Sequence, residues 1–248
     1  MIRVVAWNIR AGGGKRIERI AAQIDKWQAD VVGLCEFRAT PPSRWLQEAL
    51  AQQGLSYQIT TADSEQPSVN RLLVASRWPL GRIRLSTNPQ PRQLWLPVSV
   101  QAPRPFVLGA VYIPMAAFKG SRKYAFHRAL LRIARQWDGG PALIAGDTNT
   151  GRIGIDEQSG AFNKKSDDWM VSVERAGWRD AFRTLHGDQR IYTWYSPNAG
   201  NGFRLDQGFI NTELMPRLTA ARYEWAPSHG GRRDAVSDHA ALLIDLAD

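Results

Sequence analysis

Short apolar runs recur along the whole chain, and their length predicts strands. Runs of this kind, bounded by Gly, Pro, Asn, Asp or Ser, are typical of strands that are buried in a sheet. Prolines and glycines separate many of them from their neighbours. The predicted strands cover residues 2–7, 31–37, 56–60, 71–76, 94–100, 106–113, 142–146, 191–196, 203–211, 222–227 and 241–247.

Other segments predict helices, because their apolar side chains recur every three or four residues. In the first of them, Ile17, Ile20 and Ile24 form one apolar face. The second begins with two prolines, takes Ser43 as its N-cap and has Gly54 after its end. The helices are predicted over residues 14–30, 41–54, 121–137 and 167–176.

The order of these elements predicts the fold class. Strands and helices alternate at the start of the chain, several short strands follow, and the alternation then returns. This mixture favours two sheets packed together over one doubly wound sheet. No change in composition divides the chain, so we predict one domain over residues 1–248. The predicted class is α/β, with two packed mixed β-sheets flanked by helices.

The net charge of +9 narrows the range of partners. A basic surface attracts polyanions, nucleic acid first and anionic membranes second, although a basic protein without either partner remains an alternative. Basic groups gather around Lys119 and Arg122 and again at residues 229–233, where they suit contacts with DNA or a solvated surface equally. In the glycine-rich loop, Lys15 and Arg16 are expected near backbone phosphates.

The cysteine count and the lengths of the apolar runs indicate a cellular compartment. Cys35 is the single cysteine, so an intramolecular disulfide is excluded and a reducing compartment is expected. No apolar run approaches the ~20 residues of a membrane-spanning helix, and the first residues predict a strand and not a signal peptide. We therefore expect a cytoplasmic monomer with no membrane partner, and no protein partner is inferred.

Polar side chains stand at the ends of several predicted strands. Any one of them is explained as a turn former, but together they offer carboxylates, amides, a phenol and an imidazole. If these strand ends converge, the group could hold a hard divalent cation and manage a proton. The residues are Asn8, Glu36, Tyr112, Asp147, Asn149, Asp206, Asp238 and His239.

Each residue type suggests a role in phosphoester chemistry. Mg²⁺ takes oxygen ligands, commonly one or two carboxylates, which Glu36 and Asp238 would supply with Asn8 nearby. His239 would be cationic if Asp206 lies beside it, and would donate to a phosphoryl oxygen. The other groups also have expected roles. These are an attacking water oriented or deprotonated by Asp147, a water or phosphate oxygen steered by Asn149, and a phosphate or leaving oxygen stabilised by Tyr112. An extended strand would place Asp147 and Asn149 on one side, with Thr148 pointing away.

In chain order, the segments WNIR, LCEF, VYIP, GDTN, RLD and SDHAAL resemble the successive motifs of the endonuclease/exonuclease/phosphatase superfamily. The resemblance covers essentially the whole chain. It implies a four-layer α/β sandwich, dependence on Mg²⁺ or Mn²⁺, and hydrolysis of a phosphoester by an activated water. It also implies that Asn8, Glu36 and Asp238 surround the metal, while the other residues of the group carry the phosphate and proton work.

Among the branches of that superfamily, VYIP is similar to the exonuclease III-type apurinic/apyrimidinic endonucleases. Their apolar pocket for a flipped-out abasic sugar would correspond to Trp194, Phe203 and Leu205. Arg10 instead matches the general deoxyribonucleases, and Arg38 replaces a lysine of the repair enzymes. Arg10, Arg38 and Arg122 are predicted to contact the substrate.

These observations predict a divalent-metal-dependent DNA phosphodiesterase, either specific for abasic sites or a less specific nuclease. Two alternatives stay open: an enzyme of the same superfamily that acts on a small or lipid phosphoester, and an inactive module that binds DNA.

Overall fold

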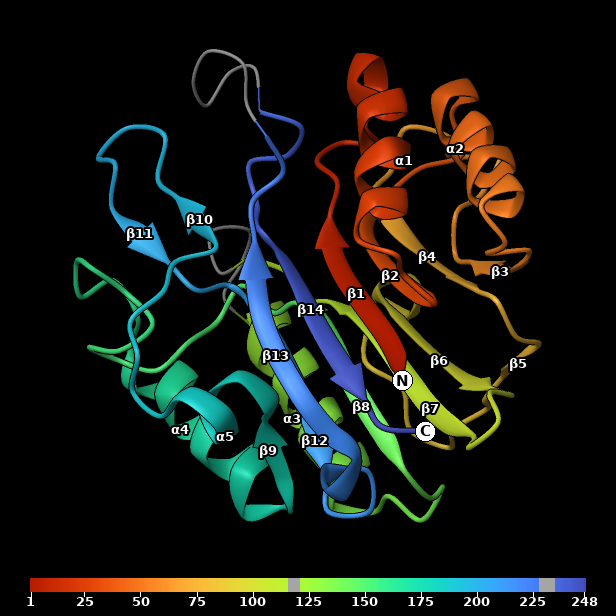
Figure 1. The fold of residues 1–248 in the computed structure, drawn as a ribbon. Coiled ribbons are helices and arrows are strands. Elements are labelled where there is room, and N and C mark those ends of the chain that lie inside the picture. Colours follow the sequence, from red (N-terminus) through yellow and green to blue (C-terminus); the bar gives the residue numbers. More distant parts are fainter. Residues whose placement is uncertain (116–120, 228–234) are drawn as a thin grey trace.

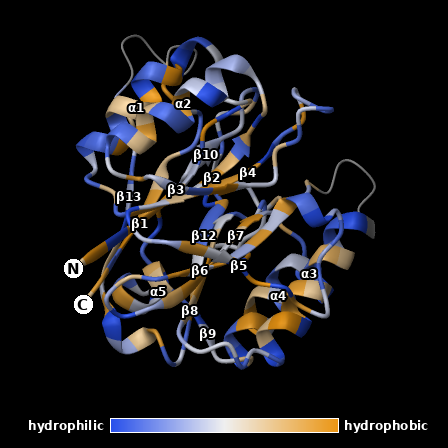
Figure 2. Ribbon diagram, turned by 90° about the vertical axis from the view of Figure 1, so that its right-hand side faces the viewer, coloured by the Kyte–Doolittle hydropathy of each residue, from blue (hydrophilic) through white to orange (hydrophobic). Residues whose placement is uncertain are grey.

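The computed structural model describes residues 1–115, 121–227 and 235–248. Two six-stranded sheets lie face to face, and helices cover the outer side of each, so that four layers are stacked (Figures 1 and 2). This arrangement confirms the predicted α/β sandwich with two mixed sheets. Within the described ranges, three short 3₁₀ turns, Gly14–Arg16, Arg92–Leu94 and Met215–Arg217, join longer elements.

The first sheet contains the N-terminal strand and the C-terminal strand side by side. β1 pairs in parallel with β2 and antiparallel with β14, and the other neighbouring pairs are antiparallel. In spatial order the strands are β13 (Leu218–Glu224), β14 (Ala241–Leu246), β1 (Ile2–Asn8), β2 (Val31–Phe37), β4 (Arg71–Ser76) and β3 (Tyr57–Thr60).

The second sheet has a similar plan, with one parallel pair at its centre. β7 and β8 are parallel, and the remaining pairs are antiparallel. In spatial order the strands are β5 (Leu80–Arg82), β6 (Trp95–Val100), β7 (Phe106–Tyr112), β8 (Ala142–Asp147), β12 (Asp206–Asn211) and β9 (Trp178–Asp180). A separate small hairpin joins β10 (Trp194–Tyr195) to β11 (Gly202–Phe203).

Helices cover both sheets and one edge of the sandwich (Figure 2). α1 (Ile17–Lys26) and α2 (Pro41–Gln52) lie on the first sheet, while α3 (Ser121–Arg135) and α4 (Lys164–Arg175) lie on the second. The short α5 (Ala181–His186) packs against β12 and β13. No helix in the described part of the chain is long and apolar enough to cross a membrane.

Three apolar layers hold these elements together. Val4, Leu108 and Ile244 belong to the layer between the sheets and are almost fully buried. A second layer joins the first sheet to α1 and α2, and a third joins the second sheet to α3 and α4. Burying one such side chain stabilises a fold by about 1.5–3 kcal/mol. The packed sandwich therefore supports the side chains at the ends of its strands.

The structure corrects several element boundaries. α2 begins at Pro41 after Thr40, so Ser43 is not the N-cap; the fixed φ of proline suits a first helical turn. α4 begins at Lys164, earlier than predicted, because the Asn163 side chain accepts a hydrogen bond from the Ser166 N–H. The first helix is shorter than predicted. The strands β5 and β9 and the helix α5 were not predicted.

The strand directions bring the predicted polar groups to one end of the sandwich. Asn8 and Glu36 lie at the ends of the parallel strands β1 and β2, and Tyr112 and Asp147 end the parallel pair β7 and β8. Asp206 begins the antiparallel β12 directly opposite Asp147. Both sheets thus deliver side chains to the same end.

Candidate active site

Asn8 connects carboxylates from the two sheets. It is the last residue of β1 and is buried. Its Nδ2 donates to Glu36 Oε1 at 3.3 Å and to Asp147 Oδ2 at 3.0 Å, and its Oδ1 accepts from the Arg10 backbone N–H at 2.9 Å. The contact from Arg10 fixes the amide orientation, so Asn8 holds the two acids at a set separation.

Glu36 projects into the site because the backbone is distorted there. It has a φ of 60° and lies at a bulge in β2, where the pairing with β4 shifts between Cys35 and Phe37. A residue other than glycine in this region costs about 1–3 kcal/mol, and such residues gather at functional sites. The carboxylate accepts from the Ala11 N–H at 2.6 Å and from the Tyr112 hydroxyl at 3.0 Å.

Tyr112 stays protonated next to this carboxylate. Burial raises the pKa of the phenol, and the negative charges of Glu36 and Asp147 raise it further. The hydroxyl is therefore a hydrogen-bond donor at any physiological pH, which suits contact with an oxygen anion.

A tight turn presents Asp147 and Asn149. Gly146 before it has a φ of 148°, and a Cβ there would lie 2.0 Å from the Val111 carbonyl oxygen, so only glycine fits. β8 ends at Asp147, whose Oδ1 accepts from the Asn149 N–H at 3.0 Å. Asn149 has a φ of 48° and donates from Nδ2 to the Ile113 carbonyl at 2.9 Å.

The prediction that strand alternation aligns Asp147 and Asn149 was therefore wrong in its reason. The two residues are neighbours because the aspartate side chain closes a turn on the following backbone. Asn149 also uses one of its amide N–H groups to hold Ile113.

The Asp147 carboxyl has an unusual pKa. Burial raises it, the charge of His239 lowers it, and the charge of Asp206 raises it again; the result is a pKa of about 7. Hydrogen bonds from Asn8 and Asn149 keep the carboxylate oriented. A carboxylate of this basicity suits general base catalysis near neutral pH.

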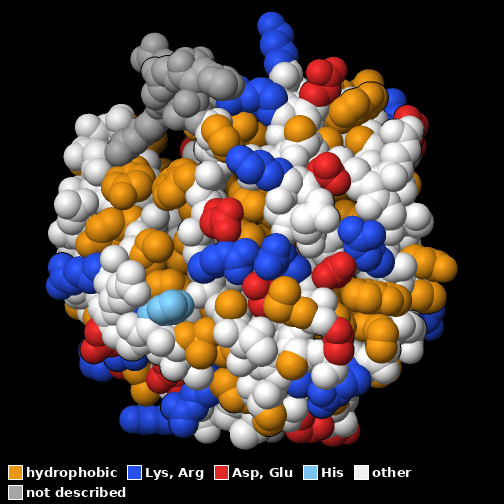
Figure 3. Space-filling model, viewed as in Figure 1, with side chains coloured by type: hydrophobic (Ala, Val, Ile, Leu, Met, Phe, Trp, Pro, Cys, Tyr) orange, Lys and Arg blue, Asp and Glu red, His pale blue; other side chains and the backbone are white. Residues whose placement is uncertain are grey.

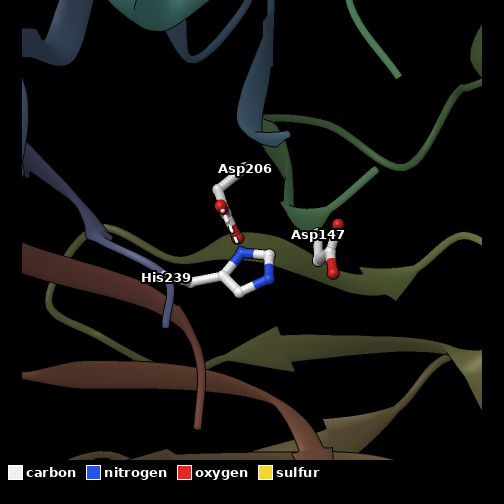
Figure 4. A group of neighbouring side chains, drawn as sticks. All are labelled: Asp147, Asp206 and His239. Carbon is white, nitrogen blue, oxygen red and sulfur yellow. Dashed lines mark hydrogen bonds and ion pairs between the residues drawn. The ribbon is translucent and has the colours of Figure 1, made fainter. Parts of the chain in front are cut away.

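Asp206 and His239 form a buried ion pair. His239 Nδ1 lies 2.8 Å from Asp206 Oδ2. Burial alone would lower the pKa of the imidazole, but the charge and hydrogen bond of Asp206 outweigh it and raise the pKa to about 10. The ring is thus cationic at neutral pH, as predicted for a close Asp206. Figure 4 shows the other ring nitrogen on the side that faces Asp147.

Backbone contacts fix the position of His239. Its carbonyl accepts from Trp7 Nε1 at 3.0 Å, and its N–H donates to Ser237 Oγ at 3.1 Å. Ser237 in turn donates to the Asn8 carbonyl at 2.5 Å. The segment that carries Asp238 and His239 is therefore attached to the end of β1.

The donor set suits a hard divalent cation. The carboxylates of Asp147 and Asp206 have ligand atoms within 4.8 Å of each other and of the His239 ring, and Asp206 Oδ1 is buried with no hydrogen-bond partner among the described residues. The His239 ring, being cationic, offers no lone pair to a metal. The Glu36 carboxylate accepts from the same Asn8 Nδ2 group that donates to Asp147. Mostly carboxylate oxygen atoms are available, which Mg²⁺ and Mn²⁺ prefer. The predicted metal ligands Asn8, Glu36 and Asp238 stay a prediction.

The aromatic residues predicted to form a pocket lie beside His239. Trp194 is on β10, and its ring centroid is 6.4 Å from that of His239. Phe203 on β11 pairs with Trp194, with ring centroids 5.9 Å apart, and also contacts Phe162. Leu205, the residue before β12, is buried. The hairpin thus adds an apolar wall to the polar site.

The predicted basic contacts have different surroundings. Arg10 is half-exposed, with Nε 4.0 Å from Asp238 Oδ2. Arg38 donates to Asn70 Oδ1 at 2.7 Å, and Arg122 is exposed at the start of α3. Arg16 instead donates to three backbone carbonyls, those of Ile9, Arg10 and Val236, so it braces the site and is not free for phosphate. Lys119 and residues 229–233 lie outside the described residues.

Figure 3 shows Lys and Arg side chains interspersed with Asp and Glu on one face of the molecule. The positive charge is therefore not concentrated on that face.

Two residues of α3 that support the site were not recognised from the sequence. Lys123, which is 5% exposed, donates from Nζ to the Asn149 carbonyl at 2.5 Å, and His127 one helical turn later lies 3.1 Å from Thr150 Oγ1. Burial lowers the pKa of Lys123 to about 8. The i, i+4 spacing of the two residues was the available signal, but a buried lysine cannot be told from a solvated one by spacing alone.

The fold and the residues at its strand ends define a class of protein. The chain belongs to the endonuclease/exonuclease/phosphatase family, whose pattern it matches over residues 5–239.

Among solved structures, an AP endonuclease from Archaeoglobus fulgidus is similar over 99% of both chains, with 17% identity and a TM-score of 0.80. The 3′-5′ exonuclease NExo from Neisseria meningitidis is similar over the whole of both chains, with 18% identity and a TM-score of 0.79. A variant of the 3′ phosphatase NExo from Neisseria, bound to product DNA hairpin, gives 16% identity and a TM-score of 0.81, again over both whole chains. These likenesses confirm the fold. A search of curated protein sequences finds no significant match.

Proposed function

We propose that the protein is a divalent-metal-dependent DNA phosphodiesterase that hydrolyses its substrate with an activated water. One observation carries the proposal: Asp147, of raised pKa, lies within 4.8 Å of the cationic His239 and its partner Asp206 at the end of the sandwich. Hydrolysis of a phosphoester needs a base that takes a proton from the attacking water and an acid that gives a proton to an oxygen. Two groups whose pKa values are pushed apart can fill these two roles.

In this proposal Asp147 orients the attacking water and takes its proton. Its carboxylate is held by Asn8 and by the Asn149 N–H, so the lone pairs directed at water keep a fixed position. Removing the proton as the oxygen attacks avoids forming free hydroxide near a phosphate anion. Lys123 holds the Asn149 carbonyl and steadies the same turn.

His239 and Tyr112 act on the oxygens of the phosphate. The His239 cation has its Nδ1 proton engaged by Asp206, which leaves the Nε2 proton for a phosphoryl oxygen. The protonated Tyr112 hydroxyl lies beside Glu36 and can turn to a second oxygen. Fixed donors aimed at developing charge typically contribute about 10²–10³-fold in rate each.

Glu36, Asp238 and Asn8 would hold the cation in this proposal, with the carboxylates of Asp147 and Asp206 close by. When bound, Mg²⁺ or Mn²⁺ would neutralise charge on the phosphate and on the oxygen that leaves. Glu36 is already positioned by the Ala11 N–H, so its carboxylate needs no rearrangement before binding.

DNA is the substrate that the remaining features favour. The chain has a net charge of +9, and the rings of Trp194 and Phe203 form an apolar wall next to His239. A baseless deoxyribose turned out of the duplex could pack against such a wall. Similar folds belong to an AP endonuclease and a 3′-5′ exonuclease. The single domain, monomeric state and cytoplasmic location stay predictions.

One assay with several substrates tests the proposal. Wild-type protein with Mg²⁺ is incubated with intact duplex DNA, duplex with one abasic analogue, duplex with a 3′-phosphate end, and a small phosphomonoester. We expect cleavage of phosphodiester bonds, and faster cleavage at the abasic analogue if the aromatic wall accepts the sugar. Activity on the small monoester alone would overturn the proposal and favour a phosphatase. DNA binding without any hydrolysis would favour an inactive module.

A further inference from the structure

A basic cleft lies at the edge of the sandwich, apart from the site described above. It opens between β3, β5 and the segment that leads into β6, and has a volume of about 760 Å³. Its polar lining includes Thr60, Thr61, Arg82, Arg84, Asn88 and Arg92. Among the described residues that line it there is no Asp or Glu.

Two of the three guanidinium groups have no partner in the described part of the chain. Arg82 donates to the Thr60 carbonyl at 2.5 Å, whereas the guanidinium groups of Arg84 and Arg92 make no hydrogen bond or ion pair with any described residue. Both side chains are exposed. Like charges gathered in a cleft without a counterion repel each other, and an anion bound between them would remove that repulsion. Guanidinium groups match phosphate oxygens through paired hydrogen bonds.

The strand register places this cleft at the same end of the sandwich as the catalytic groups. In the second sheet, Arg92 comes shortly before Trp95, which pairs with Val111, the residue that precedes Tyr112. In the first sheet, Leu73 pairs with both Thr60 and Leu34, and Leu34 lies shortly before Glu36. Figure 1 shows β3 and β5 at one edge, and Thr61 Oγ1 donates to the Gln93 carbonyl at 2.7 Å across it.

The distance along the sheet suits a continuous polymer. β6 separates β5 from β7, so the cleft is about two strand spacings, roughly 10 Å, to the side of Tyr112. One strand of DNA has a phosphate every ~3.4 Å along the helix axis, and successive phosphates are further apart through space because the strand winds, so a phosphate within about three nucleotides of the scissile bond would reach the cleft.

We propose that the cleft formed by Arg82, Arg84 and Arg92 binds backbone phosphates of the nucleic-acid strand beyond the bond that is cut. This inference rests on the proposed function, because it takes the substrate to be a polymer. Arg84 and Arg92 provide the free charge, and Thr61 and Asn88 provide neutral polar groups beside it. The cleft reads no base sequence, so it sets affinity and the length of substrate that is engaged.

The test compares the double variant Arg84→Ala/Arg92→Ala with Arg132→Ala/Arg135→Ala, which removes the same charge from exposed positions in the last turns of α3. Binding of a labelled duplex is measured in EDTA, without cleavage, over a range of salt concentrations. We expect the cleft variant to lose affinity about tenfold or more, and its plot of log K against log salt to be shallower by about 1.8, since each phosphate contact contributes ~0.9. The control should keep the wild-type slope.

Three results can be told apart. Equal slopes for the two double variants would overturn the inference. Weaker binding of inorganic phosphate by the cleft variant, with an unchanged DNA slope, would identify a site for small anions and also overturn it. If the wild-type protein cleaves no nucleic acid but the cleft variant still shows a shallower salt dependence of DNA binding, the phosphate-binding cleft is supported. The proposed function is then refuted. Hydrolysis of a small chromogenic phosphodiester, which cannot span to the cleft, should be unchanged in both variants.

Discussion

Replacement of Asp147 by Asn is expected to lower kcat for DNA cleavage by about 10³- to 10⁴-fold while leaving the affinity for DNA largely unchanged. The size follows from removal of the general base, since a positioned base typically contributes about 10²–10⁴-fold. Asparagine keeps the shape of the side chain and can still accept from the Asn149 N–H, so the turn is preserved. Single-turnover cleavage and DNA-binding titrations measure the two effects separately.

Asp25→Asn is the matched control, because Asp25 is exposed on α1 and remote from the strand ends. It should retain the wild-type rate. If Asp147→Asn weakens DNA binding as much as it lowers kcat, then Asp147 serves the structure and not the chemistry.

Loss of the acid that pairs with His239 should have an effect nearly as large. We expect Asp206→Asn to lower kcat by about 10²- to 10³-fold, the contribution of one fixed donor to a developing anion. In the wild-type protein the His239 pKa of about 10 keeps the ring cationic across the physiological range. Without Asp206, the burial that lowers this pKa is no longer outweighed. The pKa of His239 then falls to its ordinary value of about 6.5 or lower, and the ring is neutral above that pH.

The effect of the Asp206–His239 ion pair changes with pH in a direction that follows from the pKa of His239. A raised folded-state pKa means that the ion pair stabilises the protein fully below pH ~6.5 and that this contribution is lost as the pH rises towards 10. The ring keeps its proton across this range in the wild type but loses it in Asp206→Asn. The loss of kcat caused by Asp206→Asn should therefore grow between about pH 6 and about pH 8.5. NMR titration of His239 in metal-free protein measures the pKa directly. An unchanged pKa in the variant would show that Asp206 does not hold the charge.

Asp206→Asn combined with His239→Gln should be little worse than either single change, because the pair acts as one unit. Additive losses would show that the two side chains act independently of each other.

The parts of the fold that were predicted correctly are those with continuous apolar runs. Most residues of β1, β2 and β8 are buried, so their sequences show nearly continuous apolar runs, broken in β1 only by Arg3 before its last residue. The three-residue strands β5 and β9 and the short helix α5 contain too few residues to show a period. The residue type of Ser43 favours an N-cap, but the two prolines set the start of α2 earlier.

For the site, residue types at strand ends were sufficient to find the polar groups but not their geometry. Strand ends can be located from the pattern, and parallel pairing then brings Asn8 to Glu36 and Tyr112 to Asp147. The left-handed backbone at Glu36 and Asn149 depends on tertiary contacts that no local pattern encodes. The same is true of Lys123, whose burial follows from how α3 packs.

The central claim is that side chains from two sheets form one cation-dependent hydrolytic site. The most direct measurement is DNA cleavage after exhaustive chelation, followed by titration with Mg²⁺ or Mn²⁺, in the wild-type protein and in Glu36→Gln. We predict no cleavage without metal and full recovery of cleavage in the wild type. Glu36→Gln should need a metal concentration at least about tenfold higher, with unchanged thermal unfolding. Undiminished cleavage in EDTA, or the same metal dependence in both proteins, would contradict the claim.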